Sequence, residues 1–325
     1  MSRVAVTGAD GFVGRHVCRA LIARGAMVRP LARDQECADR FRSFGLNTEA
    51  PVIVGDIGVD TDWSAALDAV DAVVHLAARV HVMNETAADP LEAFREVNVR
   101  GTQLLARSAA AAGVGRLVFV SSIKVNGEST TGRGPFSERD EPAPEDPYGQ
   151  SKYEAELALK AIASETSLEV TIIRPPLVHG PGVGGNLLTL MKLVSRGLPL
   201  PLGAVRNRRS LIHVENLADV LALCTDHPNA VGAVFTVSDG MDLSTADLVR
   251  RLAEGMEKTA RLVPVPVLLL KLGLGVFGKA GVYDRLAGDL VIDPSTVMMQ
   301  LNWEPPVPVD DGLKTMGAWY RRERL

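Results

Sequence analysis

Short apolar runs alternate with longer segments of helical spacing through the first half of the chain. The runs that we read as buried strands are Val4–Thr7, Met27–Leu31, Val52–Val54, Val73–Leu76, Leu117–Ser121 and Val170–Arg174. The segments that we read as helices are Gly14–Arg24, one that starts at Ser64–Leu67, the long Pro90–Ala112, and Ser151–Ser164. Short apolar strands separated by helices predict a parallel sheet that is covered on both faces. Right-handed crossovers make such a sheet doubly wound and bring ligands to the carboxyl ends of its strands.

The alternation breaks near Pro175, where the sequence RPPLVHGPGVGG indicates a domain boundary through its prolines and glycines. A later strand pattern, Ala233–Gly240, is expected to return to the main sheet. We therefore predict an α/β fold: a Rossmann-type doubly wound parallel sheet with a smaller, mostly helical C-terminal substrate domain. The predicted dinucleotide-binding domain takes residues 1–176 and 212–240, and the second domain takes 177–211 and 241–325.

Two segments stand apart from this pattern. Asn126–Pro147 is long, polar and rich in turn residues, so we predict a mobile flap over a site rather than packed structure. Leu262–Gly278 is apolar enough to raise the question of a membrane span. It is shorter than the ~20 residues that a span needs, and it contains Lys271 and two prolines. A buried or surface-packed helix is the favoured interpretation.

The bulk composition narrows the function classes. The 325 residues hold 35 Lys and Arg against 39 Asp and Glu, a net charge of −4, so nothing favours a nucleic-acid partner. The three cysteines, Cys18, Cys37 and Cys224, are far apart and form no motif with histidine. This predicts no metal site and a reducing, cytoplasmic location. The strand pattern begins at Val4, so we expect no signal peptide.

The sequence VAVTGADGFVG places three glycines, Gly8, Gly11 and Gly14, where the first strand turns into the first helix. Gly8 permits a tight turn, Gly11 lets the backbone approach a pyrophosphate, and Gly14 lets helix and strand pack closely. The amino end of the helix offers free N–H groups and a partial positive charge to phosphates. The spacing GxxGxxG in this context predicts a dinucleotide site, with a tight turn that binds nothing as the alternative.

Further residues would complete this cofactor site. Asp56 follows a short strand, where its carboxylate could accept a hydrogen bond from an adenine amino group; a turn cap is the alternative. The sequence HLAAR, residues 75–79, ends another strand in small residues that leave room for a cofactor. At the end of the second strand stand Ala32 and Arg33 in place of an acid, and Arg33 could pair with a 2′-phosphate. This favours NADP(H), with NAD(H) left open because Asp34 lies next to Arg33.

Three residues predict acid–base chemistry. Ser122 ends a strand, while Tyr148 and Lys152 are spaced i and i+4, which sets both on one face of a helix. A phenol titrates near pH ~10, so it needs a cationic neighbour to act near neutrality. Lys152 and a positively charged nicotinamide ring would supply that charge, and Ser122 would bind the reacting oxygen. A simple Tyr–Lys pair on a helix surface is the alternative, but its place after a glycine turn and a strand-end serine favours catalysis.

With these motifs, the chain resembles the extended short-chain dehydrogenase/reductases, in the nucleotide-sugar epimerase/dehydratase branch. The matching segments run from residue 4 to about residue 305: VTGADGFVGRHV, GDI, HLAA, NVRGTQLL, VSSIKVNGE, YGQSK, RPPLVHGPG, RSLIHVENLADV and LNWEP. The resemblance implies a nucleoside diphosphate sugar, here a UDP-sugar, held between the two domains. It also implies a homodimer built from the helices Pro90–Ala112 and Ser151–Ser164.

The same resemblance implies roles for individual residues. It matches Ser122, Tyr148 and Lys152 to the family's catalytic triad, with the serine and tyrosine also touching the substrate and the lysine also touching the cofactor. The further cofactor contacts that it implies are Phe12, Val13, Ile57, Ala77, Asn98, Pro175 and Val178. The further substrate contacts that it implies are Asn186, Arg209 and Arg285.

Three reactions are open to such a site: 4,6-dehydration, 4-epimerisation and reduction of a 4-ketosugar. Dehydratases of the family carry an Asp–Glu pair where this chain has Ile123 and Lys124, which argues against dehydration. Arg33 in place of an acid favours an NADPH-dependent reductase, and this is the preferred interpretation. A UDP-hexose 4-epimerase with tightly held NAD is the alternative. A non-enzymatic NADP-binding sensor is a third, against which the retained Tyr148 and Lys152 argue.

Overall fold

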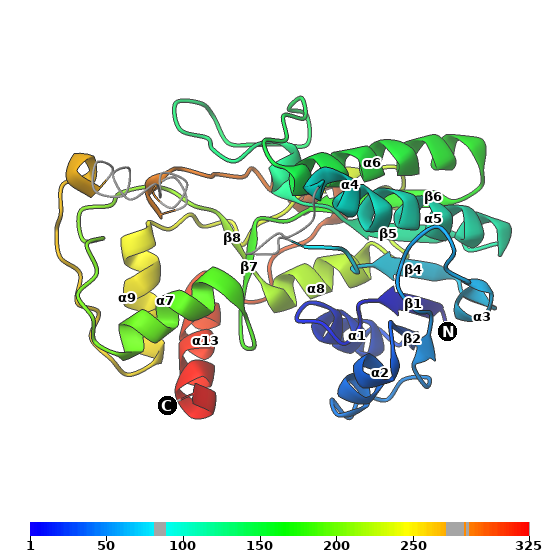
Figure 1. The fold of residues 1–325 in the computed structure, drawn as a ribbon, viewed down its shortest axis with the longest axis horizontal. Coiled ribbons are helices and arrows are strands. Elements are labelled where there is room, and N and C mark those ends of the chain that lie inside the picture. Colours follow the sequence, from blue (N-terminus) through cyan, green and yellow to red (C-terminus); the bar gives the residue numbers. More distant parts are fainter. Residues whose placement is uncertain (81–88, 271–282, 284–285, 325) are drawn as a thin grey trace.

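The core of the protein is one parallel sheet. The computed structural model describes residues 1–80, 89–270, 283 and 286–324, and in this part of the chain seven strands pair in the order β3-β2-β1-β4-β5-β6-β9 (Figure 1). These strands are β1 (Arg3–Thr7), β2 (Met27–Ala32), β3 (Val52–Ile53), β4 (Ala72–His75), β5 (Arg116–Val120), β6 (Glu169–Arg174) and β9 (Val234–Thr236). The predicted Rossmann-type sheet is confirmed, and so is the return of residues 233–240 to it, because β9 pairs in parallel with β6.

Helices cover both faces of this sheet. The α-helices are α1 (Gly14–Ala23), α2 (Gln35–Arg42), α3 (Ser64–Leu67), α4 (Pro90–Arg95), α5 (Thr102–Ala111), α6 (Pro147–Glu165), α7 (Gly185–Ser195), α8 (Val214–Leu223), α9 (Thr245–Gly255), α12 (Ser295–Leu301) and α13 (Val309–Arg324). A π turn covers Glu96–Gly101, and 3-10 turns cover Ile123–Val125 and Pro228–Ala230. α1 and α8 pack on one face of the sheet, and α3, α5 and α6 pack on the other (Figure 1).

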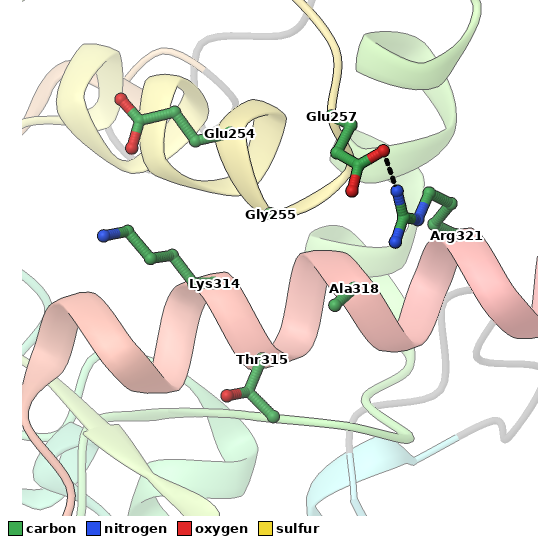
Figure 2. Close-up of a pocket in the computed structure, with 7 residues that line it drawn as sticks. All are labelled: Glu254, Gly255, Glu257, Lys314, Thr315, Ala318 and Arg321. Atoms are coloured by element: carbon green, nitrogen blue, oxygen red, sulfur yellow. Dashed lines mark ion pairs between the residues drawn. The ribbon is translucent and has the colours of Figure 1, made fainter.

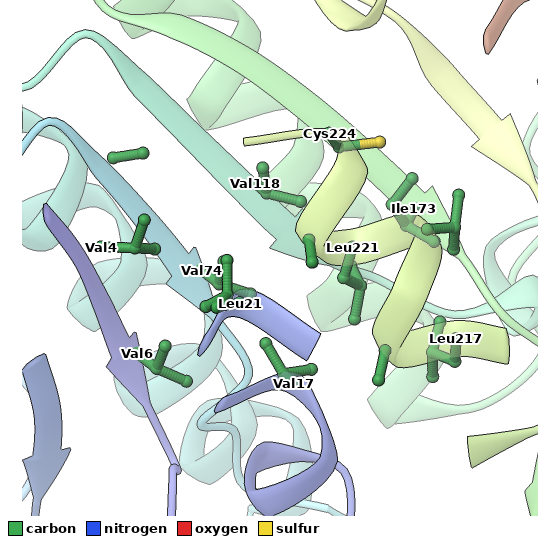
Figure 3. Packing of buried hydrophobic residues seen from close by; sticks show 14 of the residues in the cluster. Val4, Val6, Val17, Leu21, Val74, Val118, Ile173, Leu217, Leu221 and Cys224 are labelled. Atoms are coloured by element: carbon green, nitrogen blue, oxygen red, sulfur yellow. The ribbon is translucent and has the colours of Figure 1, made fainter. Parts of the chain in front are cut away.

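Alternation along the strands explains why both faces are apolar. Val4 and Val6 of β1 pack toward α1 and α8, whereas Ala5 between them packs toward α3, α5 and α6. Residues of other strands that share the first face are Val74, Val118 and Ile173 (Figure 3). Those that share the second face are Val73, Leu117 and Ile172. Because successive strand residues point to opposite sides, a strand buried on both faces is apolar throughout.

α6 begins earlier than predicted. It starts at Pro147 rather than Ser151, because the carboxylate of Asp146 caps it by accepting a hydrogen bond from the N–H of Gly149 (2.7 Å). An aspartate cap followed by proline is a strong start signal, but it lies outside the apolar periodicity on which the prediction depended. The earlier start places Tyr148 in the first turn of α6.

The prediction of a mobile flap over residues 126–147 was wrong. Phe136 is buried, its N–H donates to the carbonyl oxygen of Val291 (2.8 Å), and its own carbonyl accepts from the N–H of Asp293 (2.9 Å). Thr130 is tied to the same segment, since the N–H of Val291 donates to its hydroxyl oxygen (2.9 Å). This last partner lies 161 residues further along the chain, a distance over which a local sequence pattern gives no information.

A second group of elements packs beside the sheet. β7 (Leu177–His179) and β8 (Leu211–His213) form a short parallel pair, and α7, α9 and α13 enclose a separate apolar cluster. α9 and α13 approach closely, since a Cβ on Gly255 would lie 2.4 Å from the carbonyl oxygen of Lys314. Val297 of α12, which falls in the predicted second domain, packs in the core of the sheet instead. The division into two domains stays a prediction.

Two further predictions concern a possible membrane span and the surface of a homodimer. None of the helices in the described part of the chain is both long and apolar enough to cross a membrane. Of the helix predicted within 262–278, residues 267–270 are helical and residues 271–278 lie outside the described residues. The homodimer stays a prediction; α5 and α6, which would form it, lie side by side (Figure 1), and Leu157 of α6 is exposed.

Candidate active site

Close backbone contacts shape the glycine turn between β1 and α1. Gly8 has a φ of +65°, which favours glycine, and a Cβ there would lie 3.2 Å from the backbone nitrogen of Ala77. A Cβ on Gly14 would lie 2.1 Å from the carbonyl oxygen of Gly8, closer than any side chain tolerates. The N–H of Gly11 donates to the same oxygen (3.1 Å) and closes the turn. The turn therefore requires glycine at positions 8 and 14, as the dinucleotide interpretation expects.

Polar side chains fix the end of β4 against this turn. The hydroxyl oxygen of Thr7 accepts the N–H groups of Leu76 and Ala77 (both 3.0 Å) and lies 2.8 Å from Nδ1 of His75. Burial, and to a lesser extent the charge of Lys152, lowers the pKa of His75 to about 3, so its ring is neutral. The structure thus brings Ala77 directly against the glycine turn, as a shared cofactor site requires.

Phe12 and Val13, within the same turn, point to different parts of the molecule. Phe12 packs against the cluster that α7, α9 and α13 enclose. Val13 packs against the core on the α1 face of the sheet. The turn therefore joins the sheet to the second group of elements, and the predicted contacts of both residues with the cofactor stay predictions.

The carboxyl end of β5 and the first turns of α6 bring the predicted acid–base residues together. Lys152 is 2% exposed, and its Nζ donates to the carbonyl oxygen of Val120 (2.9 Å), two residues before Ser122. The same nitrogen lies 6.0 Å from the ring centroid of Tyr148. The hydroxyl oxygen of Ser122 accepts the N–H of Lys124 (3.2 Å), which leaves the hydroxyl proton for another partner.

Burial shifts the two titratable groups in opposite directions. It raises the pKa of Tyr148 to about 12, with a smaller contribution from the carboxylate of Asp146. It lowers the pKa of Lys152 to about 7, against a weaker opposing effect of Glu156. The chain by itself therefore does not lower the pKa of Tyr148 as expected, since Lys152 bonds a backbone carbonyl rather than the phenol. A further positive charge is needed to activate the tyrosine.

Asn98 lies in the π turn that divides the helix predicted over 90–112 into α4 and α5. A π turn takes more residues than a regular one, so a period of 3.6 does not reveal it. The Asn98 side chain donates to the carbonyl of Arg79 (3.0 Å) and accepts its N–H (2.8 Å). It also donates to the hydroxyl of Ser151 (3.0 Å), which in turn donates to the carbonyl of Tyr148 (2.8 Å). Asn98 thus holds the first turn of α6; its predicted contact with the cofactor stays a prediction.

A buried ion pair beneath the site was not predicted. Glu156 of α6 is 0% exposed and Arg174 of β6 is 3% exposed, with Oε2 and Nη2 2.5 Å apart. Glu156 also accepts from the hydroxyl of Ser121 (2.5 Å), and Arg174 donates to Oδ1 of Asn126 (3.0 Å). One pair therefore connects α6, the ends of β5 and β6, and the loop after β5. The sequence did hold one sign that Glu156 is buried near the site: it lies four residues after Lys152, on the same face of the helix.

Arg33 and Asp56 lie on an exposed rim beyond β2. Arg33 is 63% exposed, and its Nε donates to Asp34 Oδ2 (2.9 Å) and lies 3.9 Å from Asp56 Oδ1. Asp34 also caps α2, and the hydrogen bond from the N–H of Cys37 and that from Arg33 lower the pKa of Asp34 to about 2. A 2′-phosphate would compete with Asp34 for Arg33, so this geometry does not establish the predicted preference for NADP(H).

The remaining predicted cofactor residues lie at separate points around the sheet. The carbonyl of Pro175 accepts the N–H of Ile123 (3.0 Å), which ties the end of β6 to the turn after β5. Ile57 packs against the π turn, where a Cβ on Gly101 would lie 2.5 Å from its Cγ2. Val178 lies in β7 and is half-buried. Their predicted roles stay predictions.

The predicted substrate residues lie on the second group of elements. Asn186 is exposed in the first turn of α7. Arg209 is half-buried, and its Nη1 donates to the carbonyl of Gly288 (3.1 Å). Burial lowers the pKa of Arg209, against the opposing effect of Asp289. No hydrogen bond in the described part of the chain joins Asn186 to Arg209, and Arg285 lies outside the described residues.

A hollow of about 350 Å³ lies between α9 and α13 (Figure 2). Its charged lining residues are Glu254, Glu257, Lys314 and Arg321, and Arg321 forms an ion pair with Glu257. None of the predicted site residues that the structure describes lines it. We therefore do not connect this hollow with the candidate active site.

Comparisons with known proteins identify the family of the chain. The chain matches the model of the NAD dependent epimerase/dehydratase family over residues 4–238. It is 45% identical over 313 residues to a UDP-glucose 4-epimerase of Vibrio cholerae, which covers 96% of this chain and 93% of that protein. It resembles the solved dTDP-glucose 4,6-dehydratase DesIV of Streptomyces venezuelae with NAD and TYD bound, at 27% identity and a TM-score of 0.77, over 99% of this chain and 98% of that one. A UDP-glucuronic acid 4-epimerase of Bacillus cereus in complex with NAD shares the fold at 22% identity and a TM-score of 0.79, over 98% of this chain and 96% of that one.

The fold and the site define an enzyme of the extended short-chain dehydrogenase/reductase type. Within that class the chain belongs to the NAD dependent epimerase/dehydratase family, which confirms the resemblance seen in the sequence. The preferred choice of a 4-keto reductase is not confirmed, because the Vibrio cholerae relative is described as an epimerase.

Proposed function

We propose that the protein is a 4-epimerase of UDP-sugars that keeps its dinucleotide bound. The observation that carries the proposal is the convergence of Tyr148 with a buried Lys152, one turn later on α6, beside the strand end that holds Ser122. The UDP-glucose 4-epimerase of Vibrio cholerae is similar to this chain over nearly its whole length. This similarity supports C4 as the reacting carbon and a UDP-sugar as the substrate.

The residues fit a nicotinamide dinucleotide. The glycine turn packs backbone closely against backbone, with no side chain at Gly8, Gly11 or Gly14, at the amino end of α1, where a pyrophosphate is favoured. Lys152 uses one N–H on the carbonyl of Val120 and has others for a ribose hydroxyl. Asp56 is 93% exposed and accessible to an adenine amino group. The NAD bound to the solved DesIV structure supports NAD as the cofactor here.

Each catalytic residue has one task in this proposal. Bound NAD supplies the hydride acceptor for oxidation at C4 and, once reduced, the hydride donor for the return step. Tyr148 takes the proton of the C4 hydroxyl as the ketone forms and gives it back as the ketone is reduced. Ser122 donates its free hydroxyl proton to the same oxygen and stabilises developing charge. The positive charge of Lys152 favours the phenolate of Tyr148, which burial alone opposes, and an oxidised nicotinamide ring bound beside it would add a second positive charge.

One observation favours a second candidate, a reductase of UDP-4-ketosugars. Ala32 ends β2 where a carboxylate would bind the ribose hydroxyls of NAD, and Arg33 beside it is exposed. This arrangement suits a 2′-phosphate and thus NADPH. We place the reductase second because Arg33 already donates a hydrogen bond to the carboxylate of Asp34.

The first experiment incubates the purified protein with UDP-glucose, without added cofactor, and follows UDP-galactose. We expect conversion by the wild type and a loss of at least ~10²-fold in turnover for Tyr148→Phe, with the dinucleotide still bound. Tyr153→Phe is the matched control, because it removes a hydroxyl from the same helix outside the proposed site and should leave turnover unchanged.

Three results would contradict the proposal in different ways. Full turnover by Tyr148→Phe would exclude this tyrosine from proton transfer. Oxidation of NADPH that depends on a UDP-4-ketosugar, without conversion of UDP-glucose, would establish the reductase. Binding of NADP(H) without either reaction would establish a sensor.

A further inference from the structure

Lys124 joins the loop after β5 to the start of α6. Its Nζ donates to Oδ2 of Asp146 (2.5 Å) and to Oε1 of Glu128 (2.7 Å). Burial opposes the charge of this ammonium, but the hydrogen bonds to the two carboxylates outweigh burial and raise the pKa of Lys124. A charged lysine is therefore held at the capping residue of the helix that carries Tyr148.

The backbone of Lys124 touches the same helical turn. A Cβ on Gly149 would lie 2.9 Å from the carbonyl oxygen of Lys124 and 3.1 Å from Oδ1 of Asp146. That Oδ1 also accepts the N–H of Gly149 (2.7 Å). The residue next to Tyr148 is thus held from two sides, by its cap and by the backbone of Lys124.

Several groups in the described part of the chain lie near the side chain of Tyr148. These groups are Asp146, which caps α6, Lys152 of α6, and the ring of Phe94 of α4 with Arg79 over it. Lys124 and Glu128, in the loop after β5, are connected to them through the bond from Lys124 to Asp146. The Phe94 ring is neutral and packs edge-on, with centroids 6.0 Å apart. Among these groups Asp146 is the one whose negative charge adds to burial in raising the pKa of Tyr148. Lys124 binds this same carboxylate.

We propose that Lys124 is a positioning residue for Tyr148: it fixes Asp146 at the head of α6 and offsets the negative charge that this carboxylate places near the phenol. The inference rests on the proposed role of Tyr148 in proton transfer. A carboxylate that is paired with a cation opposes the phenolate less than a free one does. Lys124 therefore helps Tyr148 to reach the form that accepts the substrate proton.

The test titrates Tyr148 directly in the full-length protein with its bound dinucleotide. Tyrosine labelled with carbon-13 at Cζ is followed by NMR against pH, and the signal of Tyr148 is assigned by its loss in Tyr148→Phe. We expect Lys124→Met to move this titration to higher pH and Asp146→Asn to move it to lower pH, each by roughly half a pH unit or more. Asparagine still caps a helix, so the second variant keeps the fold of the turn.

Two controls and a double variant separate charge from general loosening of the helix. Lys124→Arg should titrate as the wild type does, and Lys258→Met, which removes an exposed lysine beyond α9, should change nothing. The double variant Lys124→Met/Asp146→Asn should return close to the wild type. The pH profile of kcat/KM for UDP-glucose should move in the same direction as each titration.

An unchanged titration in Lys124→Met would overturn the inference, and so would shifts of the same sign in both single variants. Failure of the proposed function looks different, because it would appear as full turnover by Tyr148→Phe. In that case the NMR titration would still decide whether Lys124 governs the charge state of Tyr148.

Discussion

Two arginine–carboxylate pairs lie at the carboxyl edge of the same sheet, one beneath the candidate site and one on its rim. Arg174 and Glu156 are 3% and 0% exposed, and their charges are 2.5 Å apart. Arg33 and Asp34 are 63% and 42% exposed, and theirs are 2.9 Å apart. The chemistry of the two pairs is the same, so the difference between them comes from the surroundings.

Burial makes the first pair structural and leaves the second available to a ligand. Arg174 and Glu156 have lost their water, so removal of either leaves an uncompensated buried charge. They also hold Ser121 and Asn126, so the geometry of the site depends on them. Arg33 keeps its water and its bond to Asp34 contributes little to the fold, so a phosphate can take the place of that carboxylate. A buried pair thus fixes the shape of the site, and an exposed one can set its specificity.

The largest expected effect comes from breaking the buried pair. Glu156→Gln preserves the shape of the side chain but leaves the Arg174 guanidinium without a counter-charge. We expect the free energy of unfolding to fall by about 3–5 kcal/mol, measured by urea denaturation. Glu36→Gln is the matched control, since Glu36 pairs with Arg40 on the exposed face of α2 and its loss should be barely detectable. Equal denaturation midpoints for the two variants would refute the distinction between the buried pair beneath the site and the exposed pairs.

A second prediction concerns Lys152, a buried lysine that bonds the carbonyl of Val120 and has no carboxylate bonded to it in the described structure. Its pKa is lowered from 10.5 to about 7 by burial, so between pH 7 and 10.5 the unfolded chain holds a proton that the folded chain has lost. The free energy of unfolding should therefore rise with pH in this window, by about 1.4 kcal/mol per pH unit from this group. Below pH 7 both states are protonated and the slope should vanish.

The measurement compares wild type with Lys152→Met between pH 6 and 9, after removal of bound dinucleotide. The difference between the two unfolding free energies should stay level below pH 7 and then grow in favour of the wild type. Lys258→Met, which removes an exposed lysine, should run parallel to the wild type throughout. Parallel curves for Lys152→Met as well would show that Lys152 is charged in the folded chain at these pH values.

Local motifs made much of this site predictable. The glycine turn depends on residues within seven positions, Gly8 to Gly14, and its close contacts follow from that spacing. Tyr148 and Lys152 lie one turn apart, so any helix brings them to one face. The parallel sheet was predictable for the same reason, because burial on both faces leaves a mostly apolar run in the strands.

What could not be predicted depends on partners that are distant in the sequence. Thr130 is held by Val291, 161 residues away, and a polar loop of this kind cannot be told from a free one by its composition. In the sequence, Arg174 shows only as the last residue of a strand. Its pairing with Glu156 depends on how α6 packs on the sheet. The charge of Arg33 was visible, but its bond to the neighbouring carboxylate depends on side-chain rotamers.

The last prediction concerns the exposed pair, and it bears on function rather than on stability. If Arg33 binds a 2′-phosphate, Arg33→Ala should weaken NADPH binding about tenfold to hundredfold and leave NADH binding within about twofold, because only the first ligand offers a charge-assisted bond. Both affinities can be measured from the fluorescence of the reduced nicotinamide. Arg42→Ala, which breaks an exposed pair with Asp39 on α2, should change neither. An equal, small change for both dinucleotides would mean that Asp34 keeps Arg33 from the cofactor, and it would remove the observation that favours a reductase over an epimerase.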